Sequence, residues 1–507
     1  MRRNQRGKAI IIFYINSVLG MISNLILTPL LISALTDEYY SIYKVMHSFV
    51  GPLIMLNMGL STIVARCIAK YRATDGKDEV EKKNTFALAI IIAVLMAILI
   101  EIIGSLMAWM VPTVYANTYN PEQIQLAKNL CYIFMSTTAI GVISDVFKGC
   151  ALGNERFIFY YILQTVQHIL RFALIVVLLN IGLGAIELAA ADLVVAAVIL
   201  AILLFYTLFI LNERPKLYCI NKNELKSIFA FSLAIILQAL INQVNDNMDN
   251  VILGAMVSNK EVITMYSSAL TIYMIYNSLI SVFSNVYLPE ATKLVTRGAD
   301  GEELTDFVIK PGRIQALIAT AIIFGFAICG YNFISVWIGE KYTNAYYVIL
   351  MLMIPVTIPL VQNVCLAILD AKLKRMYRSV VLAIMALINV IVSIALVHYL
   401  SFWGAALGTV LSLVFGHCIL MNIYYQKQIG LNVIRMFKSI FKGILPAGAL
   451  AAVISSPAAI LLNNTWIHFL IKGVLFITLY GICIFLFGLN NDEKKLFKYR
   501  AQRILKK

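Results

Sequence analysis

Apolar residues fill most of the chain in long runs that short polar breaks separate. A bilayer with a hydrocarbon core about 30 Å thick requires roughly 20 apolar residues for each helix that crosses it. The runs therefore predict an all-α polytopic membrane protein with about fourteen transmembrane helices. The predicted spans are 9–35, 41–66, 86–111, 125–149, 158–181, 186–212, 228–256, 262–290, 313–337, 345–371, 379–399, 402–424, 443–463 and 466–488.

The polar breaks alternate between two kinds, one rich in Lys and Arg and one nearly without them. The basic breaks are 2–8, 66–83, 148–156, 214–226, 293–313, 372–378, 427–442 and 494–507. The outer breaks, which are short, are 36–40, 112–125, 180–184, 257–261, 339–346, 398–402 and 463–465. Because loops rich in Lys and Arg stay in the cytoplasm, the pattern predicts an even number of spans with both termini inside.

Composition agrees with this class and explains the charge. The 507 residues are 61% hydrophobic and 13% charged, where soluble proteins carry about a quarter of charged residues. The net charge of +15 follows the basic breaks, so it indicates topology and attraction to anionic membrane lipid rather than nucleic-acid binding. The eight cysteines are scattered and form no CxxC pair, so the sequence predicts neither a metal site nor a disulfide framework.

The chain divides at the basic segment 212–226 and again near Tyr425. This predicts a six-helix lobe over 1–212, a second six-helix lobe over 213–424, and a helix pair with a basic tail over 425–507. The openings of the two lobes are weakly similar. Repeats related by an axis along the membrane normal are common in secondary transporters, where the substrate path lies between the halves.

Four short motifs resemble those of a known group of transporters. An acidic–aromatic loop, "DEYY", precedes the second span, and "NMGLSTIVAR" closes that span. The second lobe contains "NDNMDNVILGAM" and, after its second span, "LPEATKL". With these motifs the chain resembles polysaccharide exporters and Wzx-type O-antigen flippases of the multidrug/oligosaccharidyl-lipid/polysaccharide (MOP) superfamily. It departs from them at Ser41, where relatives often have Gly, and Lys44 occupies a position that varies among them.

The resemblance implies a fold and an activity. The fold would be two six-helix bundles facing each other as a V, with the last two helices appended. The activity would be export of a lipid-linked (polyprenyl-pyrophosphate) oligosaccharide for cell-surface polysaccharide biosynthesis, by alternating access, in a bacterial cytoplasmic membrane. A transport path within one chain implies a monomer, and a polysaccharide polymerase or ligase would be a possible partner.

The predicted fifth span carries a polar stripe on an otherwise apolar helix. Gln164, Gln167, His168 and Arg171 fall within an arc of about 100° at helical spacing. A charge at this depth is costly unless it is paired or hydrated. Arg171 is therefore either a cation in a hydrated cavity, suited to the pyrophosphate of a lipid-linked sugar, or one half of a structural ion pair with Glu101.

The predicted seventh span carries a second polar face, formed by Gln238, Asn242, Asn245 and Asp249, with Asp246 about 80° away on the same side. Facing a cavity, these side chains would contact sugar hydroxyls, and Asp246 or Asp249 would bind a coupling proton or sodium ion. The alternative is hydrogen bonding between helices, which is worth little per bond in a membrane.

Two lysines lie in apolar spans near the predicted outer side. Lys44 would either line the mouth of the cavity or extend its ammonium group to the membrane surface, and Lys472 is expected to extend to the surface.

Two other activities are consistent with the spans. A cation-coupled multidrug antiporter of the same superfamily would use an acidic cavity, for which Asp246 and Asp249 are available. A membrane enzyme such as a polymerase or ligase needs a large outer loop or a buried acid–base pair. The outer breaks are short and the five histidines lie far apart in sequence, so an enzyme is not favoured. No Gly-rich phosphate loop occurs and no cofactor is expected.

Overall fold

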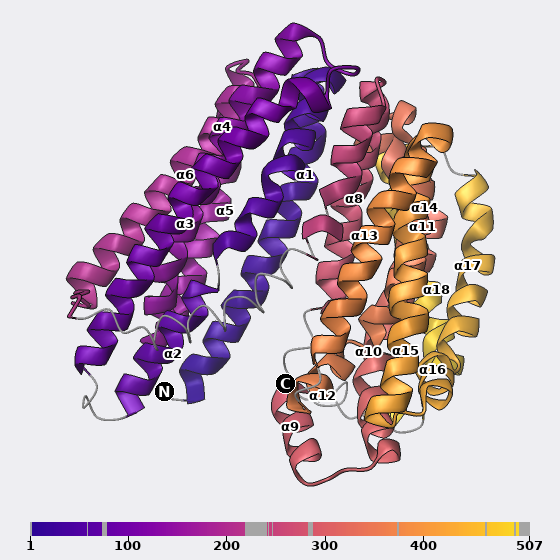
Figure 1. Ribbon diagram of the computed structural model, residues 1–507. Helices are drawn as coiled ribbons and strands as arrows, with labels where there is room; N and C mark the ends of the chain where they lie inside the picture. Colours follow the sequence, from indigo (N-terminus) through magenta and orange to yellow (C-terminus); the bar gives the residue numbers. More distant parts are fainter. Residues whose placement is uncertain are drawn as a thin grey trace. The chain divides into compact units, whose positions relative to one another are not determined.

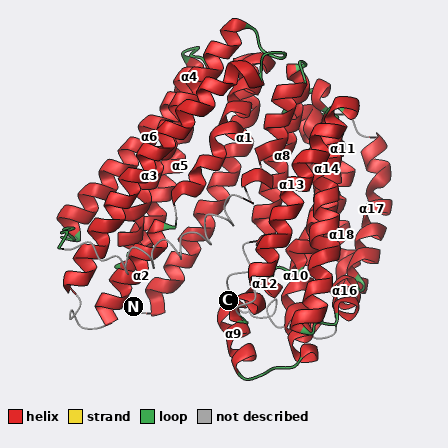
Figure 2. Ribbon diagram, in the orientation of Figure 1, coloured by secondary structure: helices red, strands yellow, loops and turns green. Residues whose placement is uncertain are grey.

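The computed structural model describes most of the chain, and every regular element in this part is a helix (Figure 2). The residues described are 3–57, 59–73, 79–218, 241, 243–245, 247–281, 287–372, 375–461, 464–490 and 493–495. The chain forms two compact units, Met1–Ser267 and Ser268–Lys507. The predicted division into 1–212, 213–424 and 425–507 rests on the internal repeat and stays a prediction.

Figure 1 labels the helices in chain order. Those of the first unit are α1 (Arg3–Val50), α2 (Leu60–Ala73), α3 (Glu79–Val114), α4 (Pro121–Gly153), α5 (Phe157–Asn180) and α6 (Ala185–Phe205). Residues 247–256 are also helical. The later helices are α8 (Lys260–Ser281), α9 (Leu288–Thr296), α10 (Gly301–Trp337), α11 (Ala345–Val361), α12 (Val364–Ala371), α13 (Arg375–Leu400), α14 (Phe402–Leu413), α15 (Met421–Tyr424), α16 (Val433–Phe441), α17 (Ile444–Leu461) and α18 (Trp466–Cys483).

Eleven helical stretches of the described residues are long and apolar enough to cross a membrane, so the prediction of a multi-pass helical membrane protein is confirmed. The first stretch, Ile12–Arg72, contains two predicted spans, which separate near Thr36, where φ is 64°. Most of the predicted span 228–256 lies outside the described residues, and α8 is not among the eleven. The count of fourteen, the V arrangement and the cytoplasmic location of both termini stay predictions.

Helix α4 begins with a cap that shapes the loop before it. The Asn120 side chain accepts a hydrogen bond from the Gln123 backbone N–H (2.8 Å), and the Asn120 N–H donates to the Gln123 side-chain oxygen (3.0 Å). Pro121 occupies the first turn, where its missing N–H costs nothing. The cap fixes the direction of residues 116–120, which matter for a pocket described below.

Helix α4 packs against α2, α3 and α6, and glycine permits its closest approach. A Cβ added at Gly149 would lie 2.4 Å from the Ser61 carbonyl oxygen and 2.7 Å from the Ser61 Cα. Both atoms belong to the backbone of α2, so no side-chain rotation can relieve the overlap. The absence of a Cβ at Gly149 therefore permits the short distance between α2 and α4.

We expect Gly149→Ala to destabilise the protein by about 1–3 kcal/mol, the usual cost of overpacking a core. The matched control is Gly141→Ala in the same helix, because a Cβ at Gly141 meets no atom within 4 Å. Alanine there should leave stability unchanged or raise it slightly through helix propensity. Melting temperatures of the two variants in detergent test this, and equal temperatures would contradict the packing argument.

The loops of the first unit contact one another within the two groups that the charge pattern defines. Among the basic breaks, Lys82 Nζ lies 2.7 Å from Glu213 Oε2, and Asn154 Nδ2 donates to Glu213 Oε1 (3.3 Å). Among the outer breaks, the Lys260 ammonium group donates to the Thr118 carbonyl oxygen (2.7 Å). The grouping of loops by charge therefore agrees with their grouping in space.

The second unit has a continuous apolar core to which α9, α10, α12, α16, α17 and α18 contribute. Lys472 of α18 lies inside this unit and is 1% exposed, so the prediction that it extends to the membrane surface was wrong. Helix α18, which carries Lys472, packs against both α10 and α17.

Candidate functional site

The polar stripe predicted on the fifth span lies on α5 and belongs to the first unit. Gln164, His168 and Arg171 are all half-buried. Apolar residues of α5 such as Ile162, Ile169 and Val177 are exposed, as expected of side chains that face lipid. The stripe therefore faces neighbouring helices of its own unit, at least in part.

Arg171 makes a paired contact with a carboxylate of the next helix. Its Nε lies 2.6 Å from Asp192 Oδ1 and its second terminal nitrogen lies 3.2 Å from Asp192 Oδ2. The Tyr43 hydroxyl donates to the same Asp192 Oδ2 (3.3 Å). The Arg171 side chain is 31% exposed and that of Asp192 is 14% exposed. The ion pair predicted as one alternative is present, but Glu101 is the wrong partner.

This geometry is the two-pronged arrangement that guanidinium groups make with carboxylates and phosphates. Two nitrogens of Arg171 are engaged, and about a third of the side chain is open to a further contact.

A second polar contact joins α5 to α1 about two helical turns before Arg171. The Asn16 side-chain amide donates to Gln164 Oε1 (3.1 Å), and Gln164 Nε2 donates to the Tyr160 hydroxyl (2.9 Å). A Cβ at Gly20 would lie 3.3 Å from the His168 ring, so the small residue brings α1 close to α5. Gln164 and His168 thus lie at a packed helix contact.

Lys44 and His47 of α1 lie near the pair. Both lie close enough to Arg171 to interact with it electrostatically. Lys44 is half-buried, with its ammonium nitrogen 5.6 Å from the centre of the Tyr40 ring. His47 is exposed and packs edge-on against Phe134 at 5.3 Å. The region around Arg171 therefore has a local excess of basic groups.

The predicted polar face of the seventh span is only partly described, because Asn242 and Asp246 lie outside the described residues. Asn245 is half-buried. Asp249 is 3% exposed and accepts a hydrogen bond from the Tyr266 hydroxyl (2.6 Å).

The sequence analysis missed Asp192 and Tyr43, which complete the Arg171 site. A signal for Asp192 existed, because it is an isolated carboxylate within an apolar span, where a charge marks a functional site by default. A further charged group was also missed: Asp145 lies 2.8 Å from Lys148 Nζ and accepts from the Asn57 amide (2.8 Å). Among the residues described, no three His, Cys, Asp or Glu side chains are placed to hold a metal ion.

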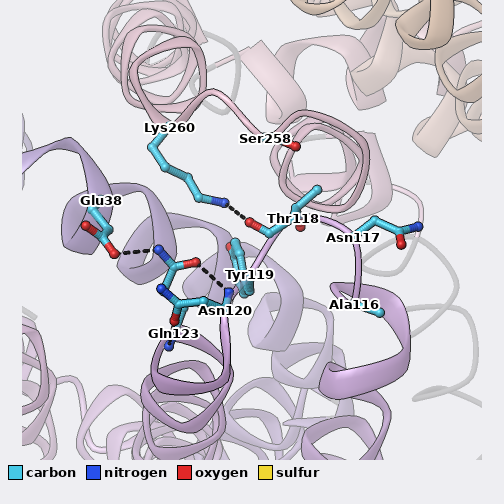
Figure 3. Close-up of a pocket in the computed structure, with 9 residues that line it drawn as sticks. All are labelled: Glu38, Ala116, Asn117, Thr118, Tyr119, Asn120, Gln123, Ser258 and Lys260. Carbon is cyan, nitrogen blue, oxygen red and sulfur yellow. Dashed lines mark hydrogen bonds between the residues drawn. The ribbon is translucent and has the colours of Figure 1, made fainter.

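A pocket of about 470 Å³ lies where three outer breaks of the first unit meet (Figure 3). Its lining residues are Glu38, Ala116, Asn117, Thr118, Tyr119, Asn120, Gln123, Ser258 and Lys260. The Lys260 ammonium nitrogen lies 4.0 Å from the centre of the Tyr119 ring, and the Gln123 amide donates to Glu38. Burial lowers the pKa of Lys260 to about 8, although the nearby Glu38 carboxylate raises it.

Lys260 is therefore expected to react with an amine-directed reagent over a lower pH range than an ordinary lysine, whose pKa is 10.5. The rate of reductive methylation at Lys260, followed by mass spectrometry against pH, should have its midpoint near 8. In Glu38→Gln the midpoint should fall further, because the carboxylate that favours the charged form is lost. A wild-type midpoint above 10 would contradict the buried position of this side chain.

Comparisons with known proteins agree on one family and one fold. A family model described as "Polysaccharide biosynthesis protein" matches residues 7–295, more than half of the chain. The structure is similar to that of the lipid II flippase MurJ in an inward closed conformation. The TM-score is 0.73 at 13% identity, and the match covers 94% of this chain and 97% of the other. No curated protein matches the chain in sequence.

Two further similar structures are transporters whose descriptions place them in the MOP superfamily. One is an inward-facing multidrug resistance MATE family transporter, with a TM-score of 0.59, 16% identity, and coverage of 85% of this chain and 99% of the other. The other comes from Pyrococcus furiosus, with a TM-score of 0.52, 15% identity, and coverage of 83% and 96%. The solved structures show that this chain shares their fold, and the family match shows that the chain belongs to the polysaccharide biosynthesis protein family.

Proposed function

We propose that the protein is a flippase that moves a lipid-linked oligosaccharide across a bacterial cytoplasmic membrane. The observation that carries the proposal is the half-buried Arg171 guanidinium of a membrane-spanning helix, paired at 2.6 Å and 3.2 Å with Asp192. The family match to polysaccharide biosynthesis proteins supports the same class of substrate. Transport, with no chemical change to the substrate, is the activity proposed.

The head group of such a substrate carries a pyrophosphate, and the Arg171 site provides the matching chemistry. A phosphate brings more negative charge than the Asp192 carboxylate, and it would meet Arg171 with Lys44 nearby. The substrate would displace Asp192 from one or both guanidinium contacts on binding. On release, Asp192 would take them back, so Arg171 would never be left as an unpaired charge in the membrane.

The rest of the substrate divides between two environments. The polyprenyl tail would stay in the bilayer, and the sugar would follow the head group through the aqueous path. Alternating access, the mechanism proposed for this fold, would expose the head group to each side in turn. Coupling to protons or sodium through Asp246 or Asp249, a monomeric state, and a polymerase or ligase partner belong to the same proposal.

A cation-coupled drug antiporter is the second candidate, because a MATE family transporter has a similar fold. A cavity for organic cations needs carboxylates that lack a cationic partner in the protein. In the described part of the first unit, Asp192 is paired with Arg171 and Asp145 with Lys148. These two ion pairs disfavour a cationic substrate at either carboxylate.

Complementation tests the proposal. A host that lacks its own flippase for lipid-linked repeat units should regain surface polysaccharide, measured by staining, when it carries this gene. The control is the same gene with a stop codon before α5. Failure to restore polymer, together with raised resistance to cationic dyes, would replace the proposal with the antiporter.

A further inference from the structure

The pocket at the outer breaks unites segments that are far apart in the chain. Glu38 comes from α1, residues 116–120 come from the loop between α3 and α4, and Lys260 begins α8 (Figure 3). The charge pattern assigns all three of these breaks to the outer side, independently of the structure. The pocket therefore lies at the end of the first unit where a transported head group would leave.

The pocket walls offer hydrogen-bonding groups of both kinds. Lys260 uses one of its three donors on the Thr118 carbonyl oxygen, and Glu38 accepts from Gln123 through one of its two oxygens. The amide side chains of Asn117 and Asn120 are exposed at the rim, as is Ser258. The pocket thus offers both acceptors and donors, and its one lysine and one glutamate balance in charge.

The inner wall is formed by Tyr119, which is 5% exposed and stacks on Tyr115 at 4.9 Å. Its hydroxyl is buried and makes no hydrogen bond to any residue that the structure describes. An unsatisfied buried hydroxyl costs about 1–3 kcal/mol. The Tyr119 ring, with the Lys260 ammonium nitrogen 4.0 Å from its centre, lines the pocket on this side.

We propose that this pocket is a saccharide subsite that holds one neutral sugar residue by its neighbouring hydroxyl groups after the head group reaches the outer side. The volume of about 470 Å³ falls within the range of small-molecule sites, about 300–1,000 Å³. A sugar hydroxyl both donates and accepts, so it would donate to Glu38 while it accepts from Lys260 or an asparagine amide. The proposal rests on the proposed function for the origin of the sugar, but not for the chemistry of the pocket.

A neutral sugar fits better than an anionic group for an electrostatic reason. An anion would be drawn to Lys260 but repelled by Glu38, which lies close enough to influence that lysine. A phosphate or uronate would therefore gain little net attraction. A neutral polyol has no such conflict and uses the carboxylate as an acceptor.

Binding of free sugars to the purified full-length protein in nanodiscs tests the subsite. The probes are the methyl glycosides of glucose, galactose, mannose and N-acetylglucosamine, with glucuronic acid as the anionic comparison, observed by saturation-transfer NMR. We expect at least one neutral glycoside to bind, and to lose at least about fivefold in signal in Glu38→Gln and in Lys260→Gln. Lys341→Gln is the matched control, because Lys341 lies over a tyrosine ring of another outer break, 4.7 Å from the Tyr342 centre.

Asn117→Ala is a further variant that is expected to fold normally, since the exposed Asn117 can be truncated without disturbing a packed contact. Its signal should also fall, by about twofold or more. Neutral glycosides that do not bind, that bind equally to all variants, or that bind more weakly than glucuronic acid would each overturn the subsite. If complementation fails while a neutral glycoside binds in a Lys260-dependent way, the subsite stands and the proposed function falls. If export is restored but no glycoside binds, the proposed function stands and the subsite falls.

Discussion

Arg171→Ala is expected to reduce export of the lipid-linked oligosaccharide by about a hundredfold. The variant removes a half-buried guanidinium that would hold the pyrophosphate, and it leaves Asp192 without its partner. Removal of one member of a desolvated, hydrogen-bonded charge pair costs about 2–5 kcal/mol, and 1.4 kcal/mol corresponds to tenfold. Surface polysaccharide per cell, normalised to the amount of folded protein in the membrane, measures the effect.

A purely structural ion pair would also fail in this variant, so a double variant separates the two roles. Arg171→Met with Asp192→Leu replaces both charges with apolar groups, a change that is often neutral or stabilising for a buried pair. We expect the double variant to be as stable as wild type but still unable to export. Export at the wild-type level in this protein would assign Arg171 and Asp192 to the structure alone.

One conservative variant and one control variant refine the assignment of Arg171. Arg171→Lys keeps the charge but loses the planar fork, so we expect partial export. Arg72→Ala is the control, because it removes an exposed guanidinium 3.8 Å from Glu155 and should export normally. Equal export by Arg171→Ala and Arg72→Ala would show that the charge of Arg171 has no role in transport.

Arg313→Ala is expected to destabilise the second unit by about 3–5 kcal/mol. Arg313 lies on α10 and its side chain is 3% exposed. It pairs with both carboxylate oxygens of Glu493 at 2.7 Å and 3.0 Å. It also donates to the carbonyl oxygens of Ser439 (2.7 Å), in the last turn of α16, and of Gly488 (2.9 Å), beyond the end of α18. Alanine would remove the donor that these acceptors share.

The melting temperature of the purified protein measures this loss. Arg297→Ala is the matched control, because Arg297 pairs with Glu303 but its side chain is 60% exposed, and exposed pairs contribute about 0–1 kcal/mol. An equal fall in melting temperature in both variants would show that the stability contributed by Arg313 does not depend on its burial.

The same contact has a pH signature. Burial alone would raise the pKa of Glu493, but hydrogen bonds from Arg313 and from the Asn490 backbone N–H hold it below the ordinary 4.5. Because the folded state favours the carboxylate, this contribution is present above pH 4.5 and disappears as the pH falls through the lowered value. Arg313→Ala should flatten this acid dependence.

The sequence by itself determined that this is a multi-pass helical membrane protein. Long apolar runs leave no alternative to membrane-spanning helices, because lipid offers no partner for backbone hydrogen bonds. The bounds follow closely, as in α5 (Phe157–Asn180, predicted as 158–181). The polar stripe of α5 was also predictable, since a helix of known pitch fixes which of its side chains share a face.

Only the tertiary structure decided what each face meets. Periodicity places Arg171 on a stripe but does not say which neighbouring helix supplies its partner, and that partner proved to be Asp192 rather than Glu101. Lys472 was expected at the surface and is buried, on a helix that packs against two others. The outer pocket combines Glu38, Thr118 and Lys260 from three separate breaks. Local sequence sets the direction of a side chain along its own helix, whereas contacts between helices depend on how all of them pack together.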